Sequence, residues 1–145
     1  MSLYIVFKYL HILAIFGVVS SVVAQHLLIQ KQMTRSELNR VSRVDAVYGV
    51  SAILVLVFGL TLWFGVGKPA SFYTSNWIFH LKLTLFIVMG LMSIIPTRYF
   101  LINRKGNPTE LISLPKNIIM IIRIELLILF LLPLLAVIMA QGITT

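Results

Sequence analysis

Four long apolar stretches, separated by short polar segments, dominate the sequence. They cover about residues 3–29, 46–66, 76–102 and 115–142, and each is long enough for a helix of roughly 20 residues to cross a bilayer. Hydrophobic residues make up 59% of the chain and charged residues only 11%, too few to cover a water-facing surface. Backbone groups in lipid must be hydrogen-bonded within the protein. We therefore expect an all-α integral membrane four-helix bundle, with one transmembrane domain over residues 1–145.

Local signals indicate where the helices begin, bend and end. Thr34 and Glu37 have the spacing of a capping box, so the second helix is expected to begin here, in water, before it enters the membrane. Pro69 is expected to end that helix, while Pro96 and Pro133 are expected to bend spans three and four. The connections are short, which predicts antiparallel neighbouring helices.

Spans one and two contain several small residues among their large apolar ones. Small residues allow the backbones of two membrane helices to approach closely, so these positions predict helix packing. They are Gly17, Ser20, Ser21, Ala24, Gly49, Ala52 and Gly59.

The basic residues indicate how the bundle is oriented. One side carries most of them: Lys31, Arg35, Arg40, Arg43, Arg98, Arg104, Lys105 and Lys116. The opposite side has only Lys8 and Lys68, with Lys82 just inside span three. The positive-inside rule therefore predicts that both connecting loops are cytoplasmic and both termini are on the outer side. The net charge of +8 is accordingly explained by topology and lipid contact rather than by nucleic-acid binding.

Two histidines near the outer ends of spans one and three form a candidate cofactor site. A rise of about 1.5 Å per residue places His11 roughly 10 Å and His80 roughly 6 Å from the start of two spans that run in the same direction. Histidines in a bundle can simply hydrogen-bond within it, or they can ligate a metal or a heme. A bare metal usually needs a third or fourth ligand, whereas a porphyrin supplies four nitrogens, so heme is the better match.

Two lysines and two tryptophans lie near the same outer end of the bundle as these histidines. Lys8 is on the helix face of His11 and can pair with a heme propionate, while Lys82 can extend to the interface or pair within the bundle. Trp63 and Trp77 are interpreted as an interfacial aromatic belt. The absence of cysteine excludes thiolate metal sites and c-type heme attachment.

A second group of polar residues is expected at the cytoplasmic end of the bundle. An ion-pair clasp is the preferred interpretation, with Asp45 facing Arg123, and with Arg98 or His26 facing Glu125. The alternative is a proton path or an anionic-substrate site, with the carboxyl groups acting as acid and base. The members of this inner cluster are His26, Asp45, Arg98, Arg123 and Glu125.

Four segments of the chain are similar to a known family. Tyr9–Leu13, Arg43–Gly49, Phe79–Leu83 and Arg123–Glu125 resemble the bacterial membrane family called domain of unknown function 2214, over nearly the whole chain. That resemblance implies four spans and no particular activity. More distantly, the segments around the two outer histidines resemble the HemJ-type protoporphyrinogen oxidases, which are four-span proteins that bind b-type heme. This second resemblance is limited to three residues, His11, His80 and Lys82, and it implies heme binding.

These observations predict a b-type heme protein of the bacterial inner membrane. His11 and His80 would ligate the iron, and the protein would exchange electrons with a quinone, a porphyrin or another membrane redox protein. If it is an enzyme, it is an oxidoreductase. Two alternatives stay open: a small cofactor-free transporter or proton-coupled carrier, which with four spans would need a homodimer, and an assembly subunit of a membrane complex.

Overall fold

The computed structural model describes residues 2–66 and 77–140. Within them the chain forms four helices that are each long and apolar enough to cross a membrane. Lys68, Pro69 and the expected end of span four near residue 142 lie outside the described residues. The chain is therefore a helical, multi-pass membrane protein, as its apolar stretches predict.

The helices begin and end close to the expected positions. Their bounds are α1, Leu3–Leu28; α2, Arg35–Thr61; α4, Trp77–Asn103; and α5, Lys116–Ala140. The capping box at the start of α2 is confirmed, because the Thr34 hydroxyl accepts from the Glu37 N–H while the Glu37 carboxylate accepts from the Thr34 N–H. A π-helical turn, η1 (Leu62–Val66), continues α2 at its other end. Both Pro96 and Pro133 lie inside helices that continue past them.

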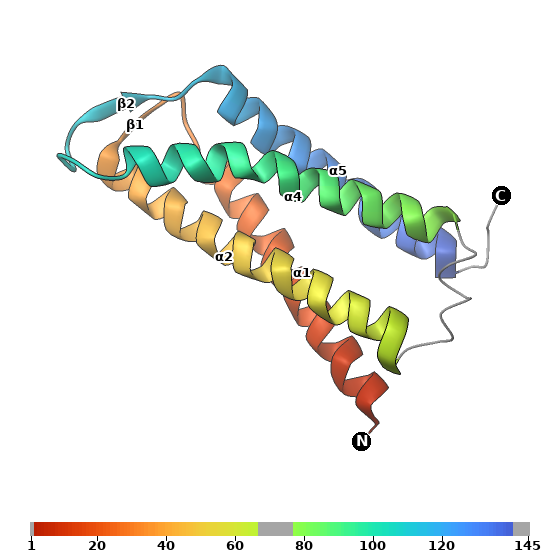
Figure 1. The fold of residues 1–145 in the computed structure, drawn as a ribbon. Helices are drawn as coiled ribbons and strands as arrows, with labels where there is room; N and C mark the ends of the chain where they lie inside the picture. Colours follow the sequence, from red (N-terminus) through yellow and green to blue (C-terminus); the bar gives the residue numbers. More distant parts are fainter. Residues whose placement is uncertain (1, 67–76, 141–145) are drawn as a thin grey trace.

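The four helices are arranged as two helical hairpins. The most extensive contacts join α1 to α2 and α4 to α5, and the contacts between the hairpins are fewer. Figure 1 shows that the hairpins lie close together at one end of the molecule and diverge toward the other. This divergence leaves room between the helices at the second end, where the functional site described below is found.

A short β-ribbon joins the two hairpins at the closed end, which we call the ribbon end. Strand β1 (Gln32–Thr34) pairs antiparallel with β2 (Leu111–Ser113), with Met33 opposite Ile112. Met33 is buried in an apolar cluster that also contains Leu38 of α2 and Phe100 of α4. The ribbon therefore connects the two loops that precede α2 and α5. Neither strand was predicted from the sequence.

Arg35, the first residue of α2, ties the ribbon to the end of α4. Its Nη1 donates to the backbone oxygens of Asn103 and Lys105, the latter at 2.8 Å. Its Nη2 forms an ion pair with Glu110 Oε2 at 2.9 Å. A guanidinium group offers five donors in a rigid plane, which suits such a set of acceptors. A residue that the sequence suggested was a topology signal thus also organises the loop after α4.

The Arg35 contacts require a glycine at position 106, which gives a first testable prediction. Gly106 has a φ of +133°, and a Cβ there would lie 2.8 Å from Arg35 Nε. Gly106→Ala should therefore lower the free energy of unfolding in detergent by about 1 kcal/mol, through backbone strain and the displaced guanidinium. Gly90→Ala in α4 is the control, because nothing lies within 4 Å of its added Cβ. Equal unfolding midpoints for the two variants would contradict this explanation.

Candidate functional site

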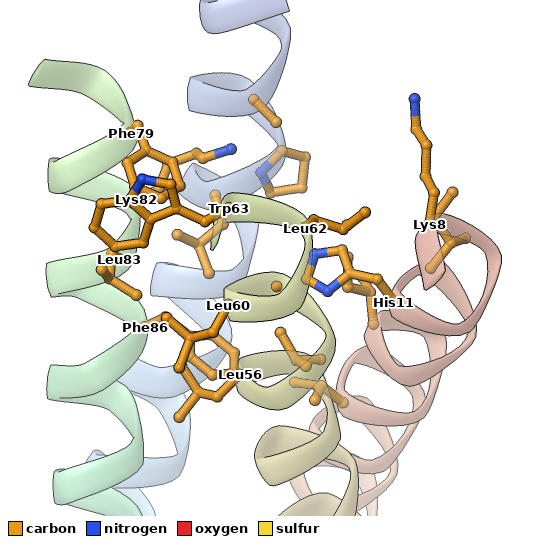
Figure 2. A pocket seen from close by; sticks show the side chains of 18 of the residues that line it. Lys8, His11, Leu56, Leu60, Leu62, Trp63, Phe79, Lys82, Leu83 and Phe86 are labelled. Carbon is orange, nitrogen blue, oxygen red and sulfur yellow. The ribbon is translucent and has the colours of Figure 1, made fainter. Parts of the chain in front are cut away.

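A cavity of about 590 Å³ lies at the end opposite the ribbon, which we call the cavity end. It is lined by the first halves of α1 and α4, the end of α2 with η1, and the second half of α5, so all four helices contribute. Figure 2 shows the side chains that surround it, with His11 on the α1 side and Trp63, Phe79 and Lys82 on the α4 side. Most of the lining is apolar, and few of the lining side chains are basic.

His11 reaches the cavity because α2 has no side chain at the point where the two helices are closest. A Cβ at Gly59 would lie only 3.1 Å from His11 Cε1, so the imidazole packs directly against the glycine. In Figure 2 the ring lies between α1 and the last turn of α2. The ring interacts with the backbone of Val55, but its buried Nδ1 makes no hydrogen bond of ordinary geometry with a described residue. A buried polar atom without a partner is unusual, and a ligand is one way to satisfy it.

Two lysines contribute positive charge to this cavity. Lys8 lies one turn before His11 and donates a 3.3 Å hydrogen bond to the hydroxyl of Tyr4, so it is held at the mouth. Figure 2 shows its side chain extending away from the His11 ring. Lys82 lines the cavity from α4 and is half-buried. No acidic side chain lines the cavity within the described residues. An apolar space with two ammonium groups suits an amphipathic anion.

Aromatic side chains form the wall between α2 and α4. Trp63 packs edge-on against Phe79, with ring centroids 4.9 Å apart, and both line the cavity. The sequence predicted Trp63 to be part of an interfacial belt; it also contributes to the cavity wall. Trp77, the other expected belt residue, is about half exposed at the start of α4.

His80 is at the cavity end but does not line the cavity. It is exposed on α4, and its ring contacts Trp63 and Phe79, with centroids 6.1 and 5.5 Å away. Lys82, two residues later, faces the cavity instead. The structure therefore places the two histidines at the same end of the bundle, as their spacing predicts, but only His11 on the cavity.

Toward the ribbon end, the inner cluster has a different composition from the predicted one. Asp45 is buried, and its two oxygens accept from Gln25 Nε2 at 2.7 Å and Thr97 Oγ1 at 2.5 Å. Glu125 is buried too, with 1% of its surface exposed, and interacts electrostatically with Asp45. Both carboxyl groups thus lie in the interior, where two neutral donors hold Asp45 and no described donor faces Glu125 Oε1.

The expected ion-pair clasp was wrong. Arg98 and Arg123 are both exposed, and neither forms an ion pair in the described part of the chain. Arg123 is two residues from Glu125, so the two side chains leave α5 in different directions and the arginine can stay near solvent or headgroups. His26 is half-buried, and its Nδ1 has no hydrogen bond with a described residue.

The two neutral partners of Asp45, Gln25 and Thr97, were not predicted from the sequence. Gln25 follows His11 by close to a whole number of helical turns, so a signal for it was present: a polar amide deep in span one on the histidine face. Thr97 follows Pro96 and gave no comparable signal. Gly59 was recognised as a packing residue, and the structure shows that the histidine ring is its neighbour.

The fold and these two sites define the class: a four-span helical membrane protein with an internal cavity and a buried carboxyl pair. The chain belongs to the family described as "Predicted membrane protein (DUF2214)", whose model matches residues 4–144. It matches no curated protein and no solved structure. Family membership thus establishes a membrane protein, and the function has to be inferred from the site.

Proposed function

We propose that this chain is a b-type heme protein of the bacterial inner membrane, in which the porphyrin would lie in the cavity and His11 would bind its iron. The observation that carries the proposal is the His11 ring, which lines a large apolar cavity and whose buried Nδ1 makes no hydrogen bond of ordinary geometry with a described residue, although the ring interacts with the Val55 backbone. Neutral imidazole is a standard axial ligand, and facing helices of a bundle are a common place for heme.

The residues around the cavity fit a heme better than a bare metal ion. No group of three or more His, Cys, Asp or Glu side chains that could hold a metal is found in the described part of the chain. A porphyrin needs only one or two protein ligands, together with apolar walls and cations for its propionates. Trp63 and Phe79 would pack against the macrocycle, while Lys8 and Lys82 would pair with the propionates.

His80 is the second ligand that the sequence analysis favoured. To reach the iron, its ring would have to turn from the exposed side of α4 past Trp63 into the cavity. A five-coordinate heme held by His11 alone needs no such rearrangement, so we propose that form. The heme would supply one-electron chemistry, and the protein would set its orientation, its charge environment and its access. A lipid-soluble partner such as a quinone is compatible with a cavity that lies within the membrane-spanning helices.

The experiment that tests this function is an absorption spectrum of the protein, purified from cells with ample heme, before and after reduction with dithionite. We expect a strong heme absorption band that shifts on reduction, at about one heme per chain. Protein that is folded but colourless, and that takes up no added hemin, would refute the proposal.

The charge of Lys82 allows a quantitative prediction about hemin affinity. Lys82→Met keeps the length and apolar stem of the side chain but removes the charge that faces the cavity. Hemin affinity should fall about tenfold, equivalent to about 1.4 kcal/mol, because a propionate would lose its partner in an apolar setting. Lys116→Met at the ribbon end is the control and should bind hemin like the parent protein. The measurement is a hemin titration in detergent, and equal affinities for the two variants would argue against a role for Lys82.

A further inference from the structure

The Asp45 carboxylate has hydrogen-bond donors on both oxygens, although no cationic side chain of the described residues pairs with it. Gln25 of α1 donates to Oδ1 and Thr97 of α4 donates to Oδ2, so three helices meet at this group. A carboxyl group that accepts from two neutral donors is suited to the ionised state, because ionised Asp is an acceptor only. Asp45 is 5% exposed, so this charge lies in the interior of the bundle.

Glu125 is in the opposite situation. It is 1% exposed, and its Oε1 makes no hydrogen bond with a described residue. The titratable groups that interact with it are Asp45 and Tyr48, both from α2. Tyr48 is 2% exposed, and its hydroxyl also lies within reach of Ser93 on α4.

No positive charge from residues 2–66 or 77–140 forms an ion pair with these two carboxyl groups. Arg98 of α4 and Arg123 of α5 are exposed, and His26 of α1, the residue after Gln25, is half-buried. Two interacting ionised carboxylates in a low-dielectric interior would repel each other and would also lose their hydration. We therefore expect the two groups to share a single negative charge and to titrate together.

We propose that Asp45 and Glu125 form a proton-binding site, in which Asp45 is the carboxylate and Glu125 holds an exchangeable proton. The geometry assigns the roles, because the two donors face Asp45, and no donor among the described residues faces Glu125 Oε1. Tyr48 interacts electrostatically with Glu125 but makes no hydrogen bond with it, so it has no assigned part in holding the proton. A metal cation does not suit this site, because Asp45 and Glu125 do not belong to a group of three or more metal-ligating side chains among the described residues. The proposal does not depend on heme.

Infrared spectroscopy of the full-length protein in lipid can test whether Glu125 carries a proton. The carbonyl stretching band of a protonated carboxylic acid should be present at neutral pH and should be lost in Glu125→Gln. Glu37→Gln is the matched control, because Glu37 is exposed, glutamine preserves the capping box, and the band should remain. If the parent protein has no such band, or if the band survives in Glu125→Gln, the proposal is overturned.

Chemical labelling gives a second readout that does not require a variant to fold. Dicyclohexylcarbodiimide partitions into membranes and reacts with protonated carboxyl groups there. Mass spectrometry should find the label on Glu125 and not on Glu37 or Glu110, and labelling should fall as the pH is raised. Thr97→Val and Gln25→Leu remove donors from Asp45, so label should then appear on Asp45 as well. Label on Asp45 rather than Glu125 in the parent protein would reverse the assigned roles.

Discussion

Replacing Gly17 with leucine should lower the free energy of unfolding by about 3 kcal/mol, the upper end of the usual cost of overpacking. Gly17 is a point on α1 where the backbone lies very close to α2. A Cβ added there would overlap the Ser51 hydroxyl oxygen and would lie 3.0 Å from Ser51 Cβ. The Ser51 hydroxyl can rotate away but its Cβ cannot, and a leucine extends well beyond its own Cβ, so the helices would have to separate. Since α1 and α2 make the most extensive contacts in the fold, the whole hairpin would be affected.

Gly49→Leu is the matched control for this prediction. Gly49 lies on α2, is exposed, and has nothing within 4 Å of an added Cβ, so its leucine should be accommodated at the lipid-facing surface. Unfolding of both variants can be followed by circular dichroism while a denaturing detergent is titrated into mild micelles. A Gly17→Leu protein as stable as Gly49→Leu would show that the close approach of α1 and α2 is not important for stability.

The sequence predicts the spans because a membrane helix depends on length and apolar content, both of which are local properties. It also predicts the start of α2, because Thr34 and Glu37, which form the capping contacts, are only three residues apart in the sequence. The β-ribbon could not be predicted in the same way. Each strand is three residues long, and the partners Met33 and Ile112 are far apart in the chain. Nothing in either segment alone indicates such pairing.

Depth in the membrane is easier to predict than direction around a helix. The rise per residue placed His11 and His80 at one end of the bundle, and they are there. Which side of α4 faces inward could not be predicted, because lipid and the bundle interior are both apolar and so leave no amphipathic pattern. His80 is consequently exposed while Lys82 lines the cavity. The same ambiguity explains why Asp45 was assigned an arginine partner when its partners are Gln25 and Thr97.

Replacing His11 with alanine should abolish heme binding, whereas replacing His80 with alanine should leave the protein with its heme. His11 lines the cavity with a buried Nδ1 that makes no hydrogen bond of ordinary geometry with a described residue, and His80 lies outside the cavity. Loss of the proposed axial ligand should lower heme affinity by more than about a hundredfold, which corresponds to about 2.8 kcal/mol. The readouts are the heme content after purification and a hemin titration of the apoprotein. The reduced parent protein should also bind carbon monoxide readily, because a five-coordinate iron has an open position.

Gly59→Leu tests the same role of His11 without changing the histidine itself. Its side chain would have to occupy the space of the His11 ring, whose Cε1 would lie 3.1 Å from even a single Cβ added at that residue. Heme should therefore be lost while His11 is still present, and Gly49→Leu, on the same helix, should keep its heme. If His80→Ala loses heme as completely as His11→Ala, and carbon monoxide does not bind the parent protein, both histidines ligate the iron. In that case α4 must rotate to bring His80 into the cavity, and the five-coordinate form proposed here is incorrect.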